Sequence, residues 1–200
     1  MNDNLRFGSH AKHLKSKLSM FSGISYRINN FLSIEAARKY YFAFIYSSIK
    51  YCIAVWGGVL HNTMYGNILL RLQRKIVKNL FGRFCSASGI WYTENIFKTL
   101  SLLKISDIHR LYVSIYMYRA FKLDDLPLIR NSINLTYPDH LHYTRHRNLA
   151  ELPFPHVKAI RINYQYQFVH IWNSLPENIR DCETLSKFKR ELTEYFLSNY

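Results

Sequence analysis

The separation of apolar from basic residues in one stretch of this chain constrains its fold more than any other feature. Residues 64–81 read MYGNILLRLQRKIVKNLF, with apolar residues at every fourth position. Such residues share one face of an α-helix, because successive residues are about 100° apart around the axis. The apolar stripe consists of Ile68, Leu72, Ile76 and Leu80. The stretch is therefore predicted to be an amphipathic helix, capped by Thr63 and ended by Gly82.

The opposite face of this predicted helix is cationic. At the helical period it carries Arg71, Arg74, Lys75 and Lys78. Cations at helical spacing on an exposed face bind phosphates, and such contacts give affinity for nucleic acid without reading its sequence. These four residues are therefore candidate nucleic-acid-binding residues.

A second amphipathic helix is predicted over residues 10–30. Its apolar face is formed by Leu14, Leu18, Phe21, Ser25 and Ile28, which recur at steps of three and four. Lys12 and Arg27 point the other way. Because this helix lacks acidic residues, we add Lys12, Lys15 and Arg27 to the candidate nucleic-acid-binding residues.

Between these two helices, residues 35–56 read EAARKYYFAFIYSSIKYCIAVW. Ser33 is the predicted N-cap, and Gly57 with Gly58 the predicted end. The aromatic density on all sides predicts a central, buried helix, with Phe44 and Trp56 in the core. Further helices are predicted over residues 94–103, 108–121 and 185–196, and the last of these can pack back on the others.

The pattern changes from about residue 130 to 165, which contains three prolines, four histidines and little helical period. It predicts an irregular connector with a short hairpin near 148–162. The fold class predicted is mostly α. A basic helical bundle occupies residues 1–126, and residues 127–200 form the irregular connector plus the C-terminal helix.

The positive charge is concentrated in the first half of the chain. Lys and Arg number 27 against 13 Asp and Glu, and residues 1–90 hold 13 of the basic but only two of the acidic residues. This distribution attracts polyanions, namely nucleic acid, an anionic membrane surface or an acidic protein. Residues 40–70 carry a single charge, Lys50, but polar residues and glycines interrupt every 20-residue apolar stretch, so no membrane span is predicted.

No catalytic signature is found in the sequence. Asp124 and Asp125 are an adjacent acidic pair of the kind that binds divalent metal ions, yet the position two residues before Asp124 holds Lys122 rather than an aromatic residue. A helix end before Pro127 explains the pair better. His140, His142 and His146 are spaced for zinc, but they lack a completing cysteine or acidic pair. Glycine-rich phosphate loops are also missing.

The three cysteines are far apart and odd in number. Such spacing does not form a disulfide framework, and it predicts a reducing, intracellular compartment.

Several words of the sequence occur in the order found in one family. They are LRFGSHAKHLKSKLSMFSGISYRINNFL, KYYFAFIYSSIKYCIAVWGG, LLRLQRKIVKNLFG, IFKTLSLLKISDI, YMYRAFKLDDLP, YTRHRN and VHIWNSLPENIRDCETLSKFKRELTEYF. Together they resemble the segment that follows the polymerase palm in the reverse transcriptases of non-LTR, jockey-like retrotransposons. The resemblance covers essentially all 200 residues.

The resemblance implies a thumb-like fragment that grips the template-primer duplex through its sugar-phosphate backbone. In that family the metal-binding aspartates lie upstream, so no catalytic residue or cofactor is expected in this chain, and Mg²⁺ belongs to the missing palm. The expected partner is an RNA or DNA duplex, bound without sequence preference, and no membrane or small-molecule substrate is expected. Two alternatives stay open: the chain is one part of a longer, active RNA-directed DNA polymerase, or it is a helical scaffold for protein interactions.

Overall fold

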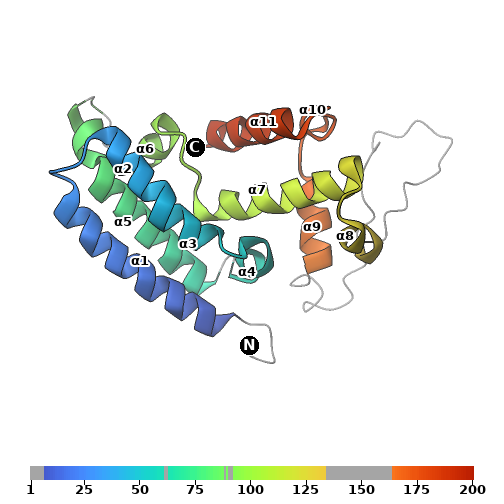
Figure 1. Ribbon diagram of the computed structural model, residues 1–200, viewed down its shortest axis with the longest axis horizontal. Coiled ribbons are helices and arrows are strands. Elements are labelled where there is room, and N and C mark those ends of the chain that lie inside the picture. Colours follow the sequence, from blue (N-terminus) through green and yellow to red (C-terminus); the bar gives the residue numbers. More distant parts are fainter. Residues whose placement is uncertain (1–6, 61–62, 88, 90–91, 134–163) are drawn as a thin grey trace. The chain divides into compact units, whose positions relative to one another are not determined.

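The structure is a computed structural model that describes residues 7–60, 63–87, 89, 92–133 and 164–200. These residues form helices joined by short turns, and no strand occurs among them, which confirms the predicted fold class (Figure 1). The predicted hairpin near 148–162 lies outside the described residues. Within the described ranges, no helix combines the length and the apolar character needed to cross a bilayer.

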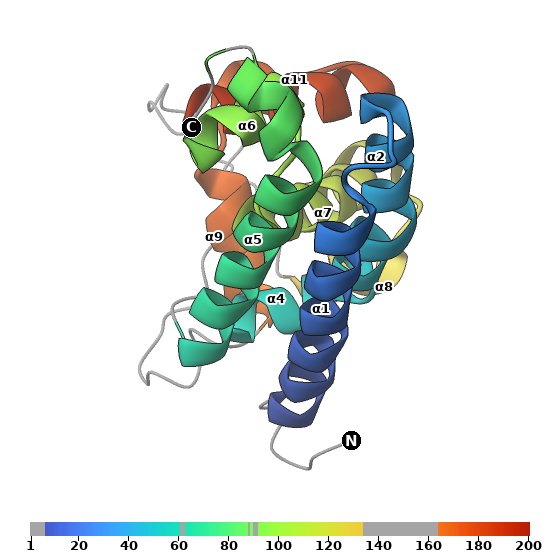
Figure 2. The same cartoon turned by 90° about the vertical axis from the view of Figure 1, so that its left-hand side faces the viewer.

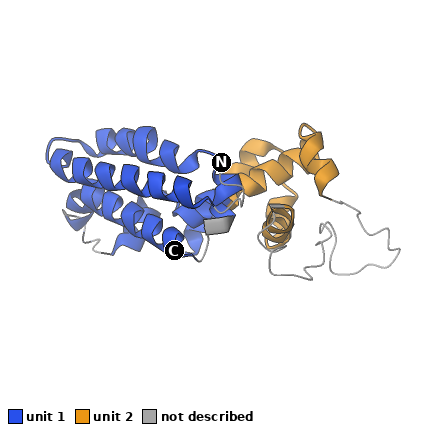
Figure 3. Ribbon diagram, turned by 90° about the horizontal axis from the view of Figure 1, so that it is seen from below, with its two compact units in different colours: residues 1–109, 194–200 blue, residues 110–193 orange. Residues whose placement is uncertain are grey.

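The chain divides into two compact units, which Figure 3 distinguishes by colour. Unit 1 comprises residues 1–109 and 194–200, and unit 2 comprises residues 110–193. The helices of unit 1 are α1 (Gly8–Ile28), α2 (Ile34–Tyr40), the π-helix η1 (Tyr41–Tyr46), α3 (Ser47–Lys50), α4 (Ile53–Leu60), α5 (Met64–Ala87) and α6 (Thr93–Thr99). Helix α7 (Ile105–Tyr118) begins in unit 1 and continues into unit 2.

The predicted first helix is present as α1. Its apolar face buries Leu14, Leu18, Phe21 and Ser25, while Lys12 and Arg27 are exposed, as the periodicity predicted. Burying these apolar side chains stabilises the helix in its place, since isolated helices are marginal in water.

The next segment begins as predicted but has a different course. The Ser33 Oγ accepts the backbone N–H of Ala36 (3.2 Å), so Ser33 is the N-cap. Helix α2 then passes through η1 into α3, and the helix stops at Tyr51 and Cys52, where Cys52 has a φ of 49°. The prediction of a single helix over residues 35–56 is therefore wrong, because the helix is interrupted between α3 and α4.

The spacing of the buried side chains explains why η1 is a π-helix. The buried side chains of this segment are Ala37, Tyr41, Ile45 and Ile49, each four residues after the last. An α-helix has 3.6 residues per turn, so a repeat of four drifts around its axis. The i→i+5 bonds of a π-helix offset this drift and keep all four side chains facing the core.

Two predictions about this segment are wrong. The segment is not buried on all sides, since the ring of Phe44 is 50% exposed, whereas Trp56 is buried as predicted. Gly57 and Gly58 do not end the helix but lie within α4. Gly57 has another role, because a Cβ atom there would lie 2.6 Å from Cδ2 of His109. A glycine is needed at this position for close approach to α7.

Helix α5 begins at the predicted cap, where the Thr63 Oγ1 accepts the backbone N–H of Gly66 (3.2 Å). It does not end at Gly82 but continues to Ala87, and the left-handed glycine beyond it is Gly89, with a φ of 75°. Cys85 is buried, and its packing stabilises the last turn of α5 beyond Gly82.

The buried stripe of α5 is rotated from the one predicted. Ile76 and Leu80 are buried as predicted, whereas Ile68 and Leu72 are only half-buried. Additional buried residues of this helix are Leu69, Gln73, Val77 and Phe81. The rotation arises because α5 packs against four neighbours, namely α1, α2, α4 and α6, rather than one.

Unit 2 has its own core around the continuation of α7. It contains the π-helix η2 (Arg119–Leu123), α8 (Pro127–Ser132), α9 (Tyr164–Asn173), α10 (Glu177–Arg180) and the first part of α11 (Leu185–Ser198). The rings of Tyr118 and Phe188 stack with centroids 4.5 Å apart, and Trp172 packs on Phe188 at 6.1 Å. The Tyr118 hydroxyl donates to the carbonyl of Cys182 (2.9 Å).

The predicted terminal helix is present as α11. The Thr184 Oγ1 accepts the backbone N–H of Lys187 (3.3 Å), and Phe188, Leu192 and Phe196 form its buried seam. Helices α8 and α9 flank the predicted irregular connector and were not predicted. Pro127 is the first residue of α8, a position where its missing N–H costs nothing.

Candidate functional site

The basic residues singled out in the sequence lie on α1 and α5, which pack side by side and run in the same direction (Figures 1 and 2). Asn79 joins the two helices, since its side-chain Nδ2 donates to the Ser22 carbonyl (3.1 Å) and its backbone carbonyl accepts Nδ2 of Asn29 (3.2 Å). Further along, Arg83 donates to the carbonyls of Asn30 (3.1 Å) and Leu32 (2.8 Å). These bonds fix the register of α1 against α5.

On α5, three of the four predicted cations form one exposed row. Arg71, Lys75 and Lys78 are exposed and lie within about 60° of one another around the helix. They point away from the buried stripe, as predicted.

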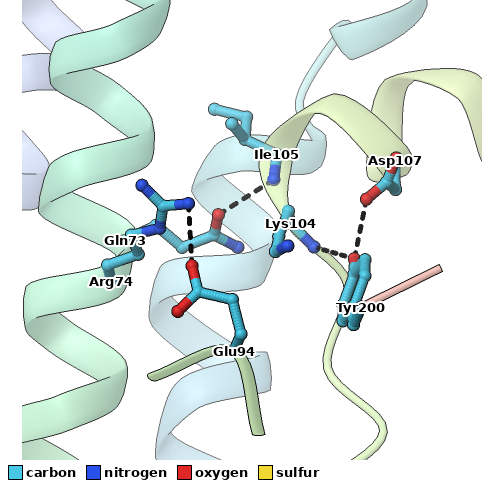
Figure 4. Close-up of polar contacts among 7 residues, drawn as sticks. All are labelled: Gln73, Arg74, Glu94, Lys104, Ile105, Asp107 and Tyr200. Atoms are coloured by element: carbon cyan, nitrogen blue, oxygen red, sulfur yellow. Dashed lines mark hydrogen bonds and ion pairs between the residues drawn. The ribbon is translucent and has the colours of Figure 1, made fainter. Parts of the chain in front are cut away.

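The fourth residue, Arg74, does not belong to this row. Its Nη2 lies 2.9 Å from Oε1 of Glu94 on α6, and both side chains are 42% exposed (Figure 4). The position of Arg74 on the flank of α5 toward α6 directs its side chain to this carboxylate. The prediction that it shares the free cationic face is therefore corrected.

On α1, Lys12, Lys15 and Arg27 are all exposed. Lys15 is about 20° around α1 from Ser22, and Lys75 is about 40° around α5 from Asn79, which is bonded to Ser22. Lys15 and Lys75 therefore border the seam between the helices on the side away from the core. Lys12 lies beside Lys15 on that side, whereas Arg27 lies on the outer flank of α1.

This surface of α1 and α5, which we call the seam face, carries a cluster of positive charge. It consists of Lys12, Lys15, Arg71, Lys75 and Lys78. None of the ion pairs formed within the described ranges includes one of these five side chains. Like charges on one surface repel each other, so a bound polyanion lowers the energy of this face.

The acidic pair Asp124 and Asp125 forms a structural turn. Asp124 has a φ of 52° and ends η2, and its carboxylate pairs with Arg130. The carboxylate of Asp125 pairs with Arg119 (2.8 Å). Nowhere in the described part of the chain do three His, Cys, Asp or Glu side chains gather as a metal site. His140, His142 and His146 lie outside the described residues.

Behind the seam face, a buried polar group that the sequence analysis missed fixes α5 to the chain before α7. Gln73 is fully buried, and its Nε2 donates to the Tyr41 hydroxyl and to the Leu103 carbonyl, both at 2.9 Å. Its Oε1 accepts the backbone N–H of Ile105 at 2.9 Å (Figure 4). Burial raises the pKa of Tyr41 to about 12, although the Gln73 bond opposes the shift. In the sequence, the feature that indicates this group is Gln73, a polar residue directly after Leu72 of the predicted apolar stripe.

A second missed group lies at the start of α7, where the Tyr200 hydroxyl meets two partners. It accepts the backbone N–H of Lys104 and donates to Oδ2 of Asp107, both at 2.7 Å (Figure 4). The Lys104 Nζ lies 3.9 Å from the centroid of the Tyr200 ring. Burial and the nearby Asp107 charge raise the pKa of Tyr200.

At the N-terminal end of α1, His10 packs on an aromatic side chain of α4. Its ring centroid is 5.2 Å from that of Trp56, whose Nε1 donates to the Tyr51 carbonyl (2.6 Å). Burial lowers the pKa of His10, and the charge of nearby His13 lowers it further. All three cysteines are free, Cys52 exposed and the other two buried.

Comparison of this chain with protein-family models, with curated proteins and with solved structures finds no significant match.

Proposed function

We propose that the seam face binds the sugar-phosphate backbone of a nucleic-acid duplex without reading its sequence. One observation carries the proposal: exposed cations from two helices, held in register by Asn79, border a single seam, and no described acidic side chain pairs with them. Phosphates on a duplex are regularly spaced anions, and lysine or arginine side chains on a rigid surface neutralise them with release of counterions.

The resemblance to retrotransposon reverse transcriptases agrees with this proposal. A thumb-like element needs to hold the template-primer duplex while it slides, and contacts to the backbone alone permit sliding. In this proposal the chain contributes binding and no catalysis, because the acidic pair at Asp124 and Asp125 is engaged with arginines.

The experiment that tests the proposal replaces the cations of α5. The triple variant Arg71→Gln, Lys75→Gln, Lys78→Gln keeps helix propensity and removes three charges. We expect its affinity for duplexes of unrelated sequence to fall equally. The slope of log K against log salt should become shallower by about 2.7, since each phosphate contact contributes about 0.9.

A matched control replaces three exposed cations on α11. The variant Lys187→Gln, Lys189→Gln, Arg190→Gln removes the same charge, but Glu191 already pairs with Arg190 (3.4 Å). It should bind duplexes nearly as the parent chain does, and circular dichroism should show both variants folded. The proposal fails if the α5 variant binds as tightly as the parent at every salt concentration.

The non-catalytic part of the proposal has its own test. Primer extension with Mg²⁺ or Mn²⁺ should stay at the level of a mock preparation for this chain. Extension above that level would instead support an active polymerase. Protein capture that persists after nuclease treatment, together with no binding to duplexes, would support the scaffold alternative.

A further inference from the structure

A cluster of aromatic rings lies where α1 packs against η1, about 100° around α1 from Ser22, which contacts α5. The ring of Phe44 in η1 packs against Phe21 of α1 and against Tyr40, with centroids 6.0 and 5.1 Å apart. The Lys17 Nζ lies 5.9 Å from the centroid of Phe21. We call Lys17, Phe21, Tyr40 and Phe44 the Phe44 platform.

The Phe44 ring of the platform is not buried in the core. Phe44 is half exposed, although its neighbours Tyr41 and Ile45 are fully buried. On α1, the exposed side chains of Met20 and Ile24 extend the apolar surface beside Phe21. Contiguous exposed apolar side chains of this kind mark interaction sites in soluble proteins.

The charge around the platform selects the kind of partner. Residues 7–50 contain seven basic residues and a single acidic one, Glu35. An occupant of this surface must therefore be anionic and must offer a flat or apolar group to the Phe44 ring. An unpaired nucleotide has both, a phosphate for a lysine and a base that stacks on an aromatic ring.

The cations of α1 connect the platform to the seam face. At 3.6 residues per turn, Lys15, Lys12, Arg27 and Lys17 follow one another around the exposed side of α1 at intervals of about 60° to 80°. Lys15 borders α5, and Lys17 lies beside Phe21 of the platform. Lys12, Lys15 and Lys17 lie within five residues of one another, about 7.5 Å along the axis, whereas Arg27 lies about 22 Å further along than Lys12. A strand that leaves a duplex on the seam face thus passes Lys15 and Lys12 before it reaches Lys17.

We propose that the Phe44 platform binds an unpaired nucleotide, whose base stacks on the Phe44 ring while Lys17 neutralises its phosphate. The site receives the single strand that continues from the duplex. This inference rests on the proposed function of the seam face. It adds a preference for a duplex with an unpaired extension over a blunt duplex.

The test compares three ligands: a blunt duplex, the same duplex with an unpaired thymidine overhang, and the same overhang made of abasic sites. The abasic strand keeps every phosphate and lacks every base. The parent chain should bind the thymidine overhang about tenfold more tightly than the abasic one, in the range measured for base stacking on aromatic side chains. Its affinities for the abasic overhang and for the blunt duplex should differ by less than this factor.

Two substitutions assign the stacking to Phe44. Phe44→Leu keeps an apolar side chain without an aromatic face, and it should abolish the preference for thymidine over abasic sites. Phe44→Trp should keep it. Leu128→Ala, which removes a more exposed apolar side chain from α8, serves as the control and should leave the preference intact. All variants should bind the blunt duplex as the parent does.

The outcomes separate this inference from the proposed function. If the parent does not distinguish thymidine from abasic overhangs, or if Phe44→Leu keeps the distinction, the platform proposal is overturned while duplex binding by the seam face stands. Binding of an acidic amphipathic peptide that depends on Phe44 and is not displaced by the overhang would also overturn it. Loss of duplex affinity in the triple variant of α5 is measured on the blunt duplex and tests the seam face alone.

Discussion

The hydroxyl of Tyr200 donates to the carboxylate of Asp107 across 93 positions of the chain, and this bond holds the last residues of unit 1 to the start of α7. Asp107 is the third residue of α7, where an acidic side chain reaches back to the N-cap N–H in a capping box. Lys104 directly precedes α7, and its N–H does not bond to Asp107 itself but to the Tyr200 hydroxyl, which in turn donates to Asp107. A distant tyrosine thus completes the cap of the helix.

Removing this hydroxyl should destabilise the protein. Tyr200→Phe removes the hydroxyl that accepts the Lys104 N–H and donates to Asp107, so we expect a loss of about 1–3 kcal/mol in the free energy of unfolding. Urea denaturation measures it. Tyr195→Phe, which removes a hydroxyl from α11 five residues before Tyr200, should change stability by less than about 0.5 kcal/mol. Equal effects of the two variants would show that the Tyr200 cap contributes nothing.

Two glycines within helices should respond in opposite directions to alanine. Gly57→Ala places a Cβ atom 2.6 Å from the His109 ring and should cost about 1–3 kcal/mol through overpacking. Gly23→Ala, on the open side of α1 with nothing within 4 Å, should stabilise by about 0.5–1 kcal/mol because it favours the helix. Thermal melts of the two variants measure both changes in stability. If Gly57→Ala does not destabilise the protein, α4 does not approach α7 as described.

Two aromatic residues of the segment before α5 should differ in their contribution to stability. Trp56→Ala removes a side chain that is 2% exposed and should cost about 3–5 kcal/mol. Phe44→Ala removes a half-exposed ring and should cost about 1 kcal/mol. The sequence placed both in the core, so equal large losses in denaturant melts would restore that prediction and contradict the exposed platform.

Stability should also depend on pH through His10. The His10 Nε2 is buried and has no hydrogen-bond partner within the described part of the chain. Burial lowers the pKa of His10 from 6.5, so the unfolded state binds the proton more readily. The stability that His10 contributes is therefore present above pH 6.5 and is lost as the pH falls toward its folded pKa.

The substitution His10→Phe isolates this contribution, since a phenyl ring keeps the packing on Trp56 and cannot be protonated. Unfolding free energies of both proteins should be measured between pH 8 and pH 5. The parent should lose more stability than the variant on acidification. Parallel pH profiles would mean that His10 is equally accessible to protons in the folded and unfolded chains.

The amino-acid sequence by itself determined that α1, α2, α5, α6, α7 and α11 are helical and where most of them begin, but not the presence of α8 and α9. The caps Ser33, Thr63 and Thr184 each act through a side chain and a backbone N–H three residues later, so their effect is local and readable from the sequence. The apolar faces of α1 and α11 were equally readable, because each follows the helical period.

Only the tertiary structure decided what lies beside each face. Gly57 and Gly82 were predicted to end helices, but glycine is tolerated inside a helix where packing stabilises both sides, and Gly57 is required there by His109. Arg74 had the same helical spacing as its neighbours, and only the position of α6 directed it to Glu94. Hydrogen bonds of Gln73 and Tyr200 join residues 30 to 96 positions apart, and a local pattern carries no information about such distances.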